Sequence, residues 1–397
     1  MSVALALHVT PLSSPLDGLL RLHNSPFNQL HITALSGRTM HLDDHEVVDF
    51  ATSAYLGLDV DVQSQDVQQA RDFGLRNGWS RATGSTALSA GLEQDLAAAL
   101  QMDQVRLASS AALINYSAFY AFQRVFPIAI YDQDAHITLK QGLNAAYTSE
   151  TRHAFRNNDL TGLQRLLARL PSETPKLIAV DGIYSMKGTA APVFQLVELC
   201  KRYNATLFID DVHGFGVHGP QGLGSIEAIK AEDREHIVLL GSFAKSCSNP
   251  VAFIAYAQRN WLAVEAIEGL NYSGPPSNLH IAICRRHLAN FPSFDVRRRR
   301  LQALSERLHA FCMQRGYGTL SKPGSPILAV RVLDEGMETA VQALYEAGII
   351  AKVAIYPVVQ RGDEVLRFTL TAAHTHAHCL RLEDALDGVA PLLGGMA

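Results

Sequence analysis

The stretch LFIDDVHGFGVHG at residues 207–219 constrains the fold of this chain more than any other part of the sequence. It begins with an apolar run that is typical of a strand buried on both faces of a parallel sheet. Asp210, Asp211 and His213 follow this run directly. They are therefore predicted at the carboxyl end of a strand, which is where open α/β sheets bind their ligands.

A second apolar run, HIVLL at 236–240, leads through Ser242 to Lys245. A lysine, a carboxylate and a histidine at one sheet edge are the groups that pyridoxal phosphate requires. The lysine holds its aldehyde as a Schiff base, and the carboxylate keeps its pyridine nitrogen protonated. Asp210 is the candidate carboxylate, since an opposite charge at contact distance shifts a pKa by about 1–3 units. We expect His213 to reach the phenolic oxygen and Ser242 to donate to the phosphate, while burial beside a cationic ring lowers the pKa of Lys245.

Each of these residues also has an ordinary structural interpretation. An Asp pair after a strand often caps a turn, and a lone lysine is often surface charge. The glycines at 214, 216 and 219 spell the dinucleotide-binding pattern G-x-G-x-x-G. That pattern has to open a helix, but Pro220 and further glycines follow, and the neighbouring aspartates would repel phosphates. We interpret the segment as a loop.

The composition excludes some classes of protein. The 397 residues are 48% hydrophobic and 18% charged, which indicates a large core and more than one domain. The net charge of −4 gives no electrostatic basis for binding nucleic acid or anionic membrane. The five cysteines show no paired spacing and are expected to be reduced thiols of a cytoplasmic protein. No apolar run reaches membrane-spanning length, and the N-terminus lacks the basic start of a signal peptide. RRRR at 297–300 is expected on the solvated face of a long helix, from about 285 to 314.

The order of apolar runs predicts an α/β protein of two domains with an N-terminal arm. The arm, residues 1–50, contains a hairpin with its turn at Ser36–Gly37. Residues 51–285 alternate strands and helices, which favours a mostly parallel sheet, and 286–397 are expected to form a smaller α+β domain. The expected strands are 105–108, 128–131, 177–180, 207–209, 236–240, 251–256, 327–333 and 365–371, and the expected helices include 89–101, 160–170, 337–347 and 376–393.

Several further segments, in order along the chain, carry a resemblance to a known family. They are SAYLGL at 53–58, GSTALSAGLEQDLA at 84–97, SSAALIN at 109–115, DQDAHITLKQG at 132–142, FRNND at 155–159, DGIYSMKGTAAP at 181–192, YSGPP at 272–276 and LRFTLTAAHT at 366–375. With the loop after residue 209 and GSFAK, they make the chain resemble the α-oxoamine synthases, a family that includes 8-amino-7-oxononanoate synthase, 2-amino-3-ketobutyrate CoA ligase, 5-aminolevulinate synthase, serine palmitoyltransferase and autoinducer synthases. The resemblance implies the fold-type-I (aspartate aminotransferase-like) architecture of pyridoxal phosphate transferases, with a mostly parallel seven-stranded sheet.

The resemblance also implies roles for residues around the cofactor. His136 would stack on the cofactor ring, and Ser185 would contact the ring region. Ser110 and the backbone amides of Ala111 and Ala112 would hold the phosphate at a helix N-terminus, where free N–H groups and the helix dipole favour an anion.

Three more residues complete the implied site. Ser273 would approach the phosphate from the other subunit of a homodimer whose active site lies at the interface. Arg367 would bind the carboxylate of the amino acid substrate, a role that suits a planar bidentate donor. Ser53 stands near the same carboxylate, where members of the family often have asparagine.

The implied reaction is an acyl transfer. Lys245 would remove the α-proton of a bound amino acid, and the carbanion would attack acyl-CoA or an acyl-carrier thioester, usually with loss of CO₂, to give an α-amino ketone. Departures from the family pattern at Ser89, at SCSNPVAF after the lysine and at Lys187 suggest secondary metabolism or signalling. Lys187 is expected in solvent, with contact to an anionic acyl donor as the alternative. The alternatives are another reaction type on the same lysine (aldolase, racemase or aminotransferase) or a non-catalytic partner subunit.

A histidine-rich segment suggests one further kind of site. HTHAH at 374–378 has the residue types of a metal site, but histidines two apart do not share a helix face. We expect no metal there and expect Thr375 to cap the last helix.

Overall fold

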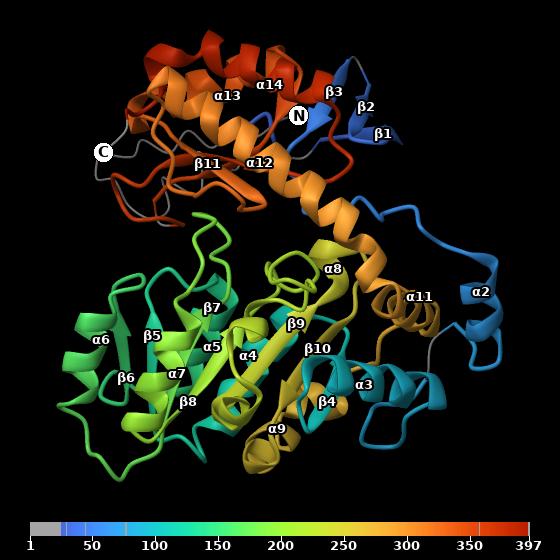
Figure 1. Cartoon of the computed structure of the whole chain (residues 1–397), viewed down its shortest axis with the longest axis vertical. Coiled ribbons are helices and arrows are strands. Elements are labelled where there is room, and N and C mark those ends of the chain that lie inside the picture. The colour runs from blue at the N-terminus through green and yellow to red at the C-terminus, as the bar shows by residue number, and fades with distance from the viewer. Residues whose placement is uncertain (1–24, 29, 44, 76–77, 357, 396–397) are drawn as a thin grey trace, which may run out of the picture.

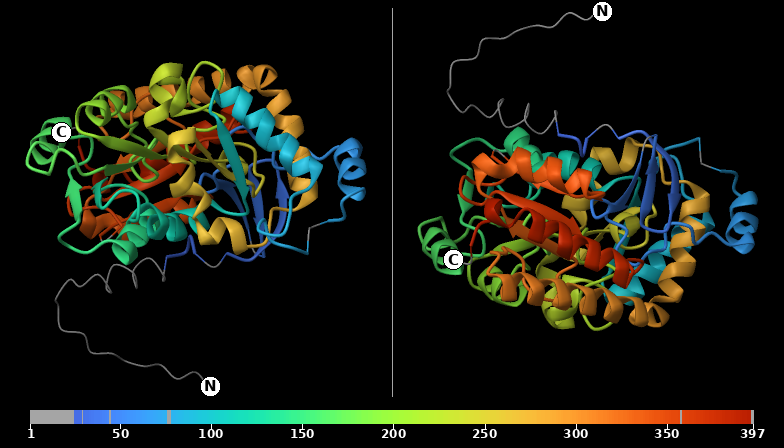
Figure 2. Two further views of the ribbon diagram at one scale, coloured as in Figure 1. Left: turned by 90° about the horizontal axis from the view of Figure 1, so that it is seen from below. Right: turned by 90° about the horizontal axis from the view of Figure 1, so that it is seen from above.

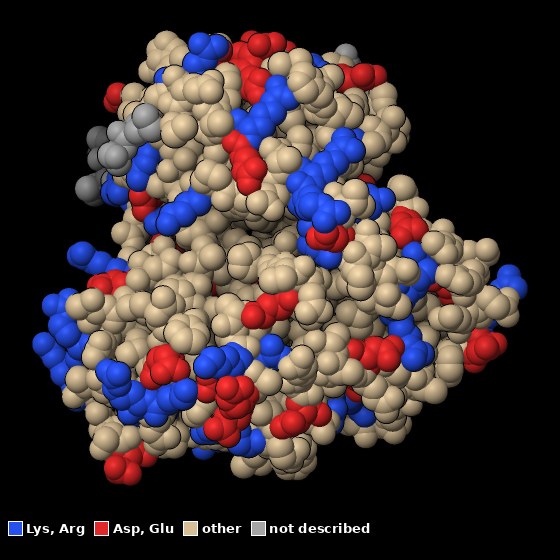
Figure 3. Space-filling model, viewed as in Figure 1, with Lys and Arg blue, Asp and Glu red and all other residues tan. Residues whose placement is uncertain are grey.

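The computed structural model describes residues 25–28, 30–43, 45–75, 78–356 and 358–395. The chain forms a large lobe around a central sheet and a smaller lobe that holds the C-terminal part, with the long helix α12 (Asp295–Arg315) running from one to the other (Figure 1). Figure 3 shows a hollow between the two lobes on this face, with basic and acidic side chains interspersed around it.

The sheet of the large lobe has seven strands in the order β4-β10-β9-β8-β7-β5-β6. Only β10 runs antiparallel to its neighbours. The predicted mostly parallel seven-stranded sheet is therefore confirmed. The strands are β4 (Gln104–Ala108), β5 (Ile128–Asp132), β6 (Arg152–Phe155), β7 (Lys176–Asp181), β8 (Ala205–Asp210), β9 (Ile237–Ser242) and β10 (Ala252–Tyr256).

Alternate side chains of this sheet enter two separate cores because successive residues of a strand point to opposite faces. On one face, residues such as Ile209 and Leu239 pack with apolar side chains of α3, α6, α7 and α11. On the other, residues such as Phe208 and Leu240 pack with α4, α5, α9 and α10. The helices are α3 (Ala87–Leu100), α4 (Ala111–Phe122), α5 (Ile137–Ala146), α6 (Leu160–Leu167), α7 (Val193–Arg202), α9 (Trp261–Glu265), α10 (Glu268–Tyr272) and α11 (Asn278–Ala289).

The small lobe combines both ends of the described chain. The sheet β11-β14-β13 packs beneath α12, α13 and α14, which lie side by side in Figure 2. A second sheet, β1-β2-β3-β12, joins the predicted arm to this lobe, because β12 pairs in parallel with β3. The elements are β1 (Ile32–Ser36), β2 (Thr39–Leu42), β3 (Glu46–Asp49), β11 (Ile327–Arg331), β12 (Ile349–Ile350), β13 (Lys352–Ala354), β14 (Val365–Thr369), α13 (Met337–Glu346) and α14 (His376–Gly388).

Most of the predicted elements are present. The arm hairpin is present, but it turns at Gly37–Arg38, one residue later than predicted, since Ser36 pairs with Thr39 and Gly37 has a positive φ of 60°. The single long helix expected from 285 to 314 is wrong. Helix α11 ends at Ala289, a 3₁₀ turn with Pro292 follows, and α12 begins at Asp295, because proline cannot continue the hydrogen bonding of a helix.

The glycine-rich pattern after β8 has a structural explanation that does not require a bound nucleotide. Asp211 is buried and accepts hydrogen bonds from both the backbone N–H and the hydroxyl of Ser225, at 2.7 Å each. A Cβ at Gly214 or Gly224 would lie about 2 Å from this carboxylate, so the glycines allow the loop to close around it. Burial raises the pKa of Asp211 to about 7. The segment remains a loop, as predicted.

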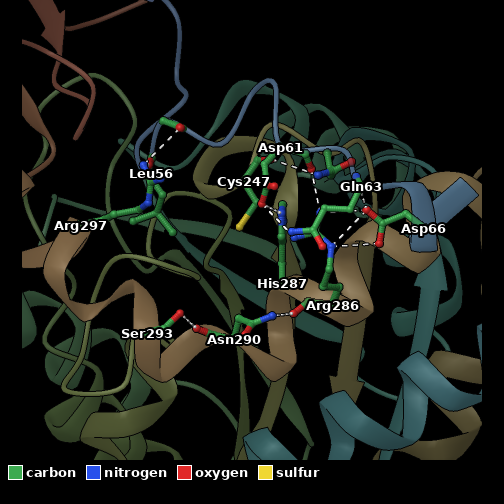
Figure 4. Close-up of polar contacts among 12 residues, drawn as sticks. Leu56, Asp61, Gln63, Asp66, Cys247, Arg286, His287, Asn290, Ser293 and Arg297 are labelled. Carbon is green, nitrogen blue, oxygen red and sulfur yellow. Dashed lines mark hydrogen bonds and ion pairs between the residues drawn. The ribbon is translucent and has the colours of Figure 1, made fainter.

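The chain that leaves the lobe interface after residue 55 is fixed to α11 by ion pairs (Figure 4). Arg286 contacts Asp61 and Asp66 of this segment, and His287 bonds to Asp61 at 2.9 Å. Arg297 donates to the carbonyl of Leu56 at 2.9 Å. These contacts hold in place the segment that leads out of the site described next, including α2 (Ser64–Arg71).

Candidate active site

A cavity of about 270 Å³ lies at the carboxyl ends of β7, β8 and β9 and at the N-terminal ends of α4 and α5. This edge is where a parallel sheet places its ligands. Eight of the residues predicted from sequence line it: Ser110, Ala111, Ala112, His136, Asp210, His213, Ser242 and Lys245. Residues more than 130 positions apart in the chain therefore meet in one cavity.

Lys245 lies on α8 (Phe243–Ser246), a single turn directly after β9. Within the described residues its Nζ makes no hydrogen bond or ion pair. Burial lowers the pKa of this amine, and the nearby Arg367 lowers it further, while Asp210 opposes the shift. The amine is therefore closer to the neutral, nucleophilic form than an exposed lysine.

Asp210 ends β8 and is buried on the floor of the cavity. Its Oδ2 accepts a hydrogen bond of 2.7 Å from Asn115 on α4, and its Oδ1 accepts from the backbone N–H of Val212 at 3.3 Å. Burial raises the pKa of Asp210, and the hydrogen bond from Asn115 and the charges of His136 and Lys245 oppose that rise. A buried carboxylate with a raised pKa gains most from a cationic partner.

His136 is the N-cap residue that directly precedes α5. Its backbone N–H donates to Asp181 at the end of β7 at 3.0 Å, and its Nδ1 lies 2.7 Å from the hydroxyl of Thr138. Burial lowers the pKa of His136, and nearby Asp210 opposes the shift. Hydrogen bonds to the backbone and to the ring of His136 therefore fix the position of its imidazole.

His213 is paired with a tyrosine from a distant segment. The Nδ1 of His213 is 2.6 Å from the hydroxyl of Tyr55, and both side chains are buried. Burial lowers the pKa of His213 well below its ordinary value and raises the pKa of Tyr55, so Tyr55 is the donor. Since Nδ1 accepts, the proton of the neutral imidazole is on Nε2, which suits a hydrogen bond to an oxygen in the cavity.

The N-terminus of α4 supplies a site for an anion. Ser110 precedes the helix, and its side chain does not cap a helix N–H, so both the hydroxyl and the first amides are free for a ligand. Ser242 differs from the prediction in its contacts. It accepts from the N–H of Ala244 and donates to the carbonyl of Val251, both at 3.1 Å, so a phosphate contact requires this hydroxyl to rotate.

Arg367 lies on β14 of the small lobe, only 1% exposed. Its Nε donates to the backbone carbonyl of Ser185 at 2.5 Å, and its Nη1 donates to Thr369 at 2.7 Å. Ser53 is buried too, and its hydroxyl makes no hydrogen bond within the described part of the chain. Arg367 therefore connects the small lobe to the loop after β7.

Ser273 lines a different pocket, formed with Gly84, Ser85 and Ser89. It does not line the cavity of Lys245 within one chain, and its place in a second subunit's site stays a prediction. The expectation that Lys187 lies in solvent is wrong. Its Nζ is 2.7 Å from both Asp134 and Asp363, because the side chain lies between the two lobes where these carboxylates meet.

Four further members of the site were not predicted from the sequence: Asn115, Thr138, Asp181 and Tyr55. Each is in a segment that the resemblance includes, but nothing in its local pattern indicates a contact with Asp210, His136 or His213. Asn115 and Thr138 lie in the first two turns of α4 and α5, and Asp181 ends β7, and these positions were the available signal. Tyr55 lies in the segment between β3 and α2 and offered none. No group of histidine, cysteine, aspartate and glutamate side chains arranged to hold a metal ion occurs among the described residues.

Comparison with known proteins agrees with this geometry. The family model "Aminotransferase class I and II" matches residues 45–386. The chain is 30% identical to 8-amino-7-oxononanoate synthase of Paracidovorax citrulli over 91% of this chain and 89% of that protein. It is 28% identical to serine palmitoyltransferase of Bacteroides ovatus, over 87% and 88% of the two chains. The structure of Sphingomonas wittichii serine palmitoyltransferase superposes with a TM-score of 0.85 at 22% identity, covering 97% of this chain and all of that one.

The fold and the matched family define a pyridoxal phosphate-dependent enzyme of fold type I. More particularly, the chain belongs to the α-oxoamine synthase family, whose members are pyridoxal phosphate-dependent acyltransferases.

The donor set of the cavity fits this cofactor. A lysine whose pKa is lowered suits the aldehyde, a buried carboxylate suits the ring nitrogen, and an uncapped helix N-terminus suits the phosphate. None of the described helices combines the length and hydropathy needed to cross a membrane.

Proposed function

We propose that this protein condenses an amino acid with an acyl-CoA or acyl-carrier thioester, releasing the thiol and CO₂ and forming an α-amino ketone. The observation that carries this proposal is the meeting of Lys245, Asp210 and His136 in one cavity beside a buried arginine. When bound, the cofactor supplies an electron sink for a carbanion at the amino acid α-carbon. The acyl chain length and the amino acid are not set by these residues.

The environment of each side chain in the cavity supports a specific role in this reaction. The lowered pKa of Lys245 makes its amine a base that can remove the α-proton. Asp210 holds a proton on the ring nitrogen, and His213 donates to the phenolic oxygen through Nε2. Arg367 would bind the substrate carboxylate through the N–H groups that Ser185 and Thr369 do not occupy, since their bonds use Nε and Nη1.

The active form is proposed to be a homodimer. Exposed aromatic and aliphatic side chains lie on neighbouring elements around the cavity, namely Tyr116 and Tyr120 on α4, Ile137 on α5 and Tyr272 on α10. A contiguous exposed apolar surface of this kind marks an interface. Ser273 follows Tyr272 directly, so a second copy on this surface would bring it towards the partner's cavity.

The test measures thiol release from acyl-CoA by purified protein with pyridoxal phosphate and a panel of amino acids. All five cysteines are buried, so a colorimetric thiol reagent has a low background from the native protein. We expect thiol release only with both substrates, and none from Lys245→Ala. Exchange of the amino acid α-proton without thiol release for any acyl donor tested would instead favour a racemase, an aldolase or an aminotransferase.

A further inference from the structure

Asn115 donates two hydrogen bonds from one amide nitrogen. Its Nδ2 is 2.7 Å from Oδ2 of Asp210 and 3.0 Å from Oγ1 of Thr138. The amide nitrogen, and not the amide oxygen, faces Asp210, which is the arrangement that stabilises an ionised carboxylate because such a group only accepts. Asn115 is 1% exposed, and its Oδ1 has no hydrogen-bond partner in the described part of the chain. The orientation of this amide is therefore fixed by its two acceptors.

The direction of the next hydrogen bond follows from the first. Thr138 Oγ1 already accepts from Asn115, so its one hydroxyl proton is available for His136 Nδ1 at 2.7 Å. The backbone N–H of Thr138 also donates to the same Nδ1 at 3.3 Å. Nδ1 of His136 is thus an acceptor from two donors, and the ring proton is on Nε2. Within the described residues Nε2 makes no hydrogen bond.

We propose that Asn115 and Thr138 are positioning residues that set the protonation of two groups at once: Asn115 keeps the Asp210 carboxylate ionised, and Thr138 fixes His136 as the Nε2–H tautomer. His136 then presents an N–H donor to an oxygen of the substrate. This inference rests on the proposed places of Asp210 at the ring nitrogen and His136 on the ring face. It adds the reason why both groups are held in the state that the reaction needs.

The charges around His136 support a neutral ring. Asp210, from β8, raises its pKa, whereas Lys245, Lys140 and Lys352, from three other elements, lower it, and burial lowers it more than any of them. Asp181 accepts the backbone N–H of His136 and does not bond to its ring. The two donors at Nδ1 act in the same direction as burial, since protonation of Nδ1 would break both bonds.

The test uses ¹⁵N NMR of the holoenzyme labelled at histidine, with His136→Gln to assign the signal. Wild type is expected to show Nδ1 without a proton and Nε2 with one across the neutral range. Thr138→Val removes the hydroxyl at nearly constant volume, so the pKa of His136 is expected to rise by about half to one unit, with the Nδ1–H tautomer appearing. Thr138→Ser keeps the hydroxyl and should restore the wild-type signal.

Asn115→Ala separates the two effects. It is expected to weaken cofactor binding about tenfold, measured by absorbance after dialysis, because the pKa of Asp210 rises by about one unit without its donor. Thr138→Val should bind the cofactor with an affinity within about twofold of the wild-type value. The inference is overturned if His136 carries its proton on Nδ1 in wild type, or if Thr138→Ser shifts the signal as much as Thr138→Val. A protein that binds no pyridoxal phosphate would overturn the proposed function itself.

Discussion

The central chemistry depends on charges that are buried before any ligand arrives. Asp210 and Lys245 each shift the pKa of the other, and the buried Arg367 lowers the pKa of Lys245. Single substitutions here are expected to alter rates and affinities without unfolding the sheet.

Asp210→Asn removes the negative charge but keeps the shape of the side chain. The ring nitrogen then loses the partner that raises its pKa by about 1–3 units, so kcat is expected to fall by roughly 10- to 1,000-fold. Steady-state thiol release measures this, with cofactor content determined on the same samples. A variant that binds cofactor and retains full kcat would contradict the role of Asp210.

Arg367→Lys tests the carboxylate site. Lysine keeps the charge but lacks the planar fork, so the KM for the amino acid is expected to rise about 10- to 100-fold, with a smaller change in the KM for acyl-CoA. Arg315→Lys, at the end of α12, serves as the control, since its ion pair is with Asp387 and not with the groups around Arg367. Equal effects on both substrates would point to a disturbed lobe and not to carboxylate binding.

Site residues near the ends of neighbouring strands could be predicted from the sequence. Hydrogen bonds between segments that are distant in the chain could not. Asp210 and His213 share one loop, and Lys245 follows the adjacent strand, so strand order alone predicts that they meet. Asn115 contacts Asp210 from 95 positions away, and Tyr55 contacts His213 from 158 positions away. Such hydrogen bonds depend on how helices pack on the sheet, which no local pattern encodes.

At the scale of elements, the ion pairs of α11 determine how firmly the segment from 56 to 66 is held. Burial raises the pKa of Asp61, but the hydrogen bonds and charges of Arg286 and His287 outweigh burial and leave this pKa below its ordinary value. Because the folded pKa lies below the unfolded one, the stabilisation is complete above about pH 4 and is lost as pH falls through the folded pKa.

Asp61→Asn is therefore expected to lower the free energy of unfolding by about 1–2 kcal/mol at pH 7. The difference from wild type should shrink only as the pH falls below about 4 towards the lowered pKa of folded Asp61. Urea unfolding at about pH 7, 4.5 and 2.5 measures this, with the exposed Asp72→Asn as control. A difference that is as large at the lowest pH as at pH 7 would contradict the ion-pair account.

The boundaries of helices and strands could be predicted where an apolar run or a turn residue marks them in the sequence. The apolar runs of the parallel strands, which are buried on both faces, and the hairpin turn at Gly37 follow directly from residue types. The break between α11 and α12 was missed although Pro292 was visible, because the surrounding apolar and basic residues continue a helical pattern. The short edge strand β6 has only one buried residue and offered no apolar run.

At the scale of the whole molecule, the two lobes are linked by the ion pairs of Lys187 with Asp134 and Asp363. These side chains are mostly buried, and Asp363 lies four residues before Arg367. The position of the small lobe, and hence of Arg367, is expected to depend on this contact.

Lys187→Met is predicted to raise the KM for the amino acid a few-fold and to leave cofactor binding unchanged. A double-mutant cycle with Asp363→Asn should give a coupling free energy of about 1 kcal/mol in urea unfolding. Additive effects of the two substitutions would show that the ion pair does not connect the lobes energetically.

The proposed dimer gives a prediction for the surface of the large lobe. Tyr120→Glu places a charge in the exposed apolar surface of α4, so it is expected to yield monomers with strongly reduced activity, since Ser273 would no longer reach the partner's cavity. Sedimentation velocity and thiol release are measured together. Met313→Glu, an equally exposed position on α12, should remain dimeric and active.

The most direct test of the account is to find which amine holds the cofactor. Borohydride reduction of the holoenzyme fixes pyridoxal phosphate to that amine, and peptide mass spectrometry then locates it. We predict the modification on Lys245 alone, and none after Lys245→Ala. Modification of Lys140 or Lys352 with Lys245 unmodified would contradict the account.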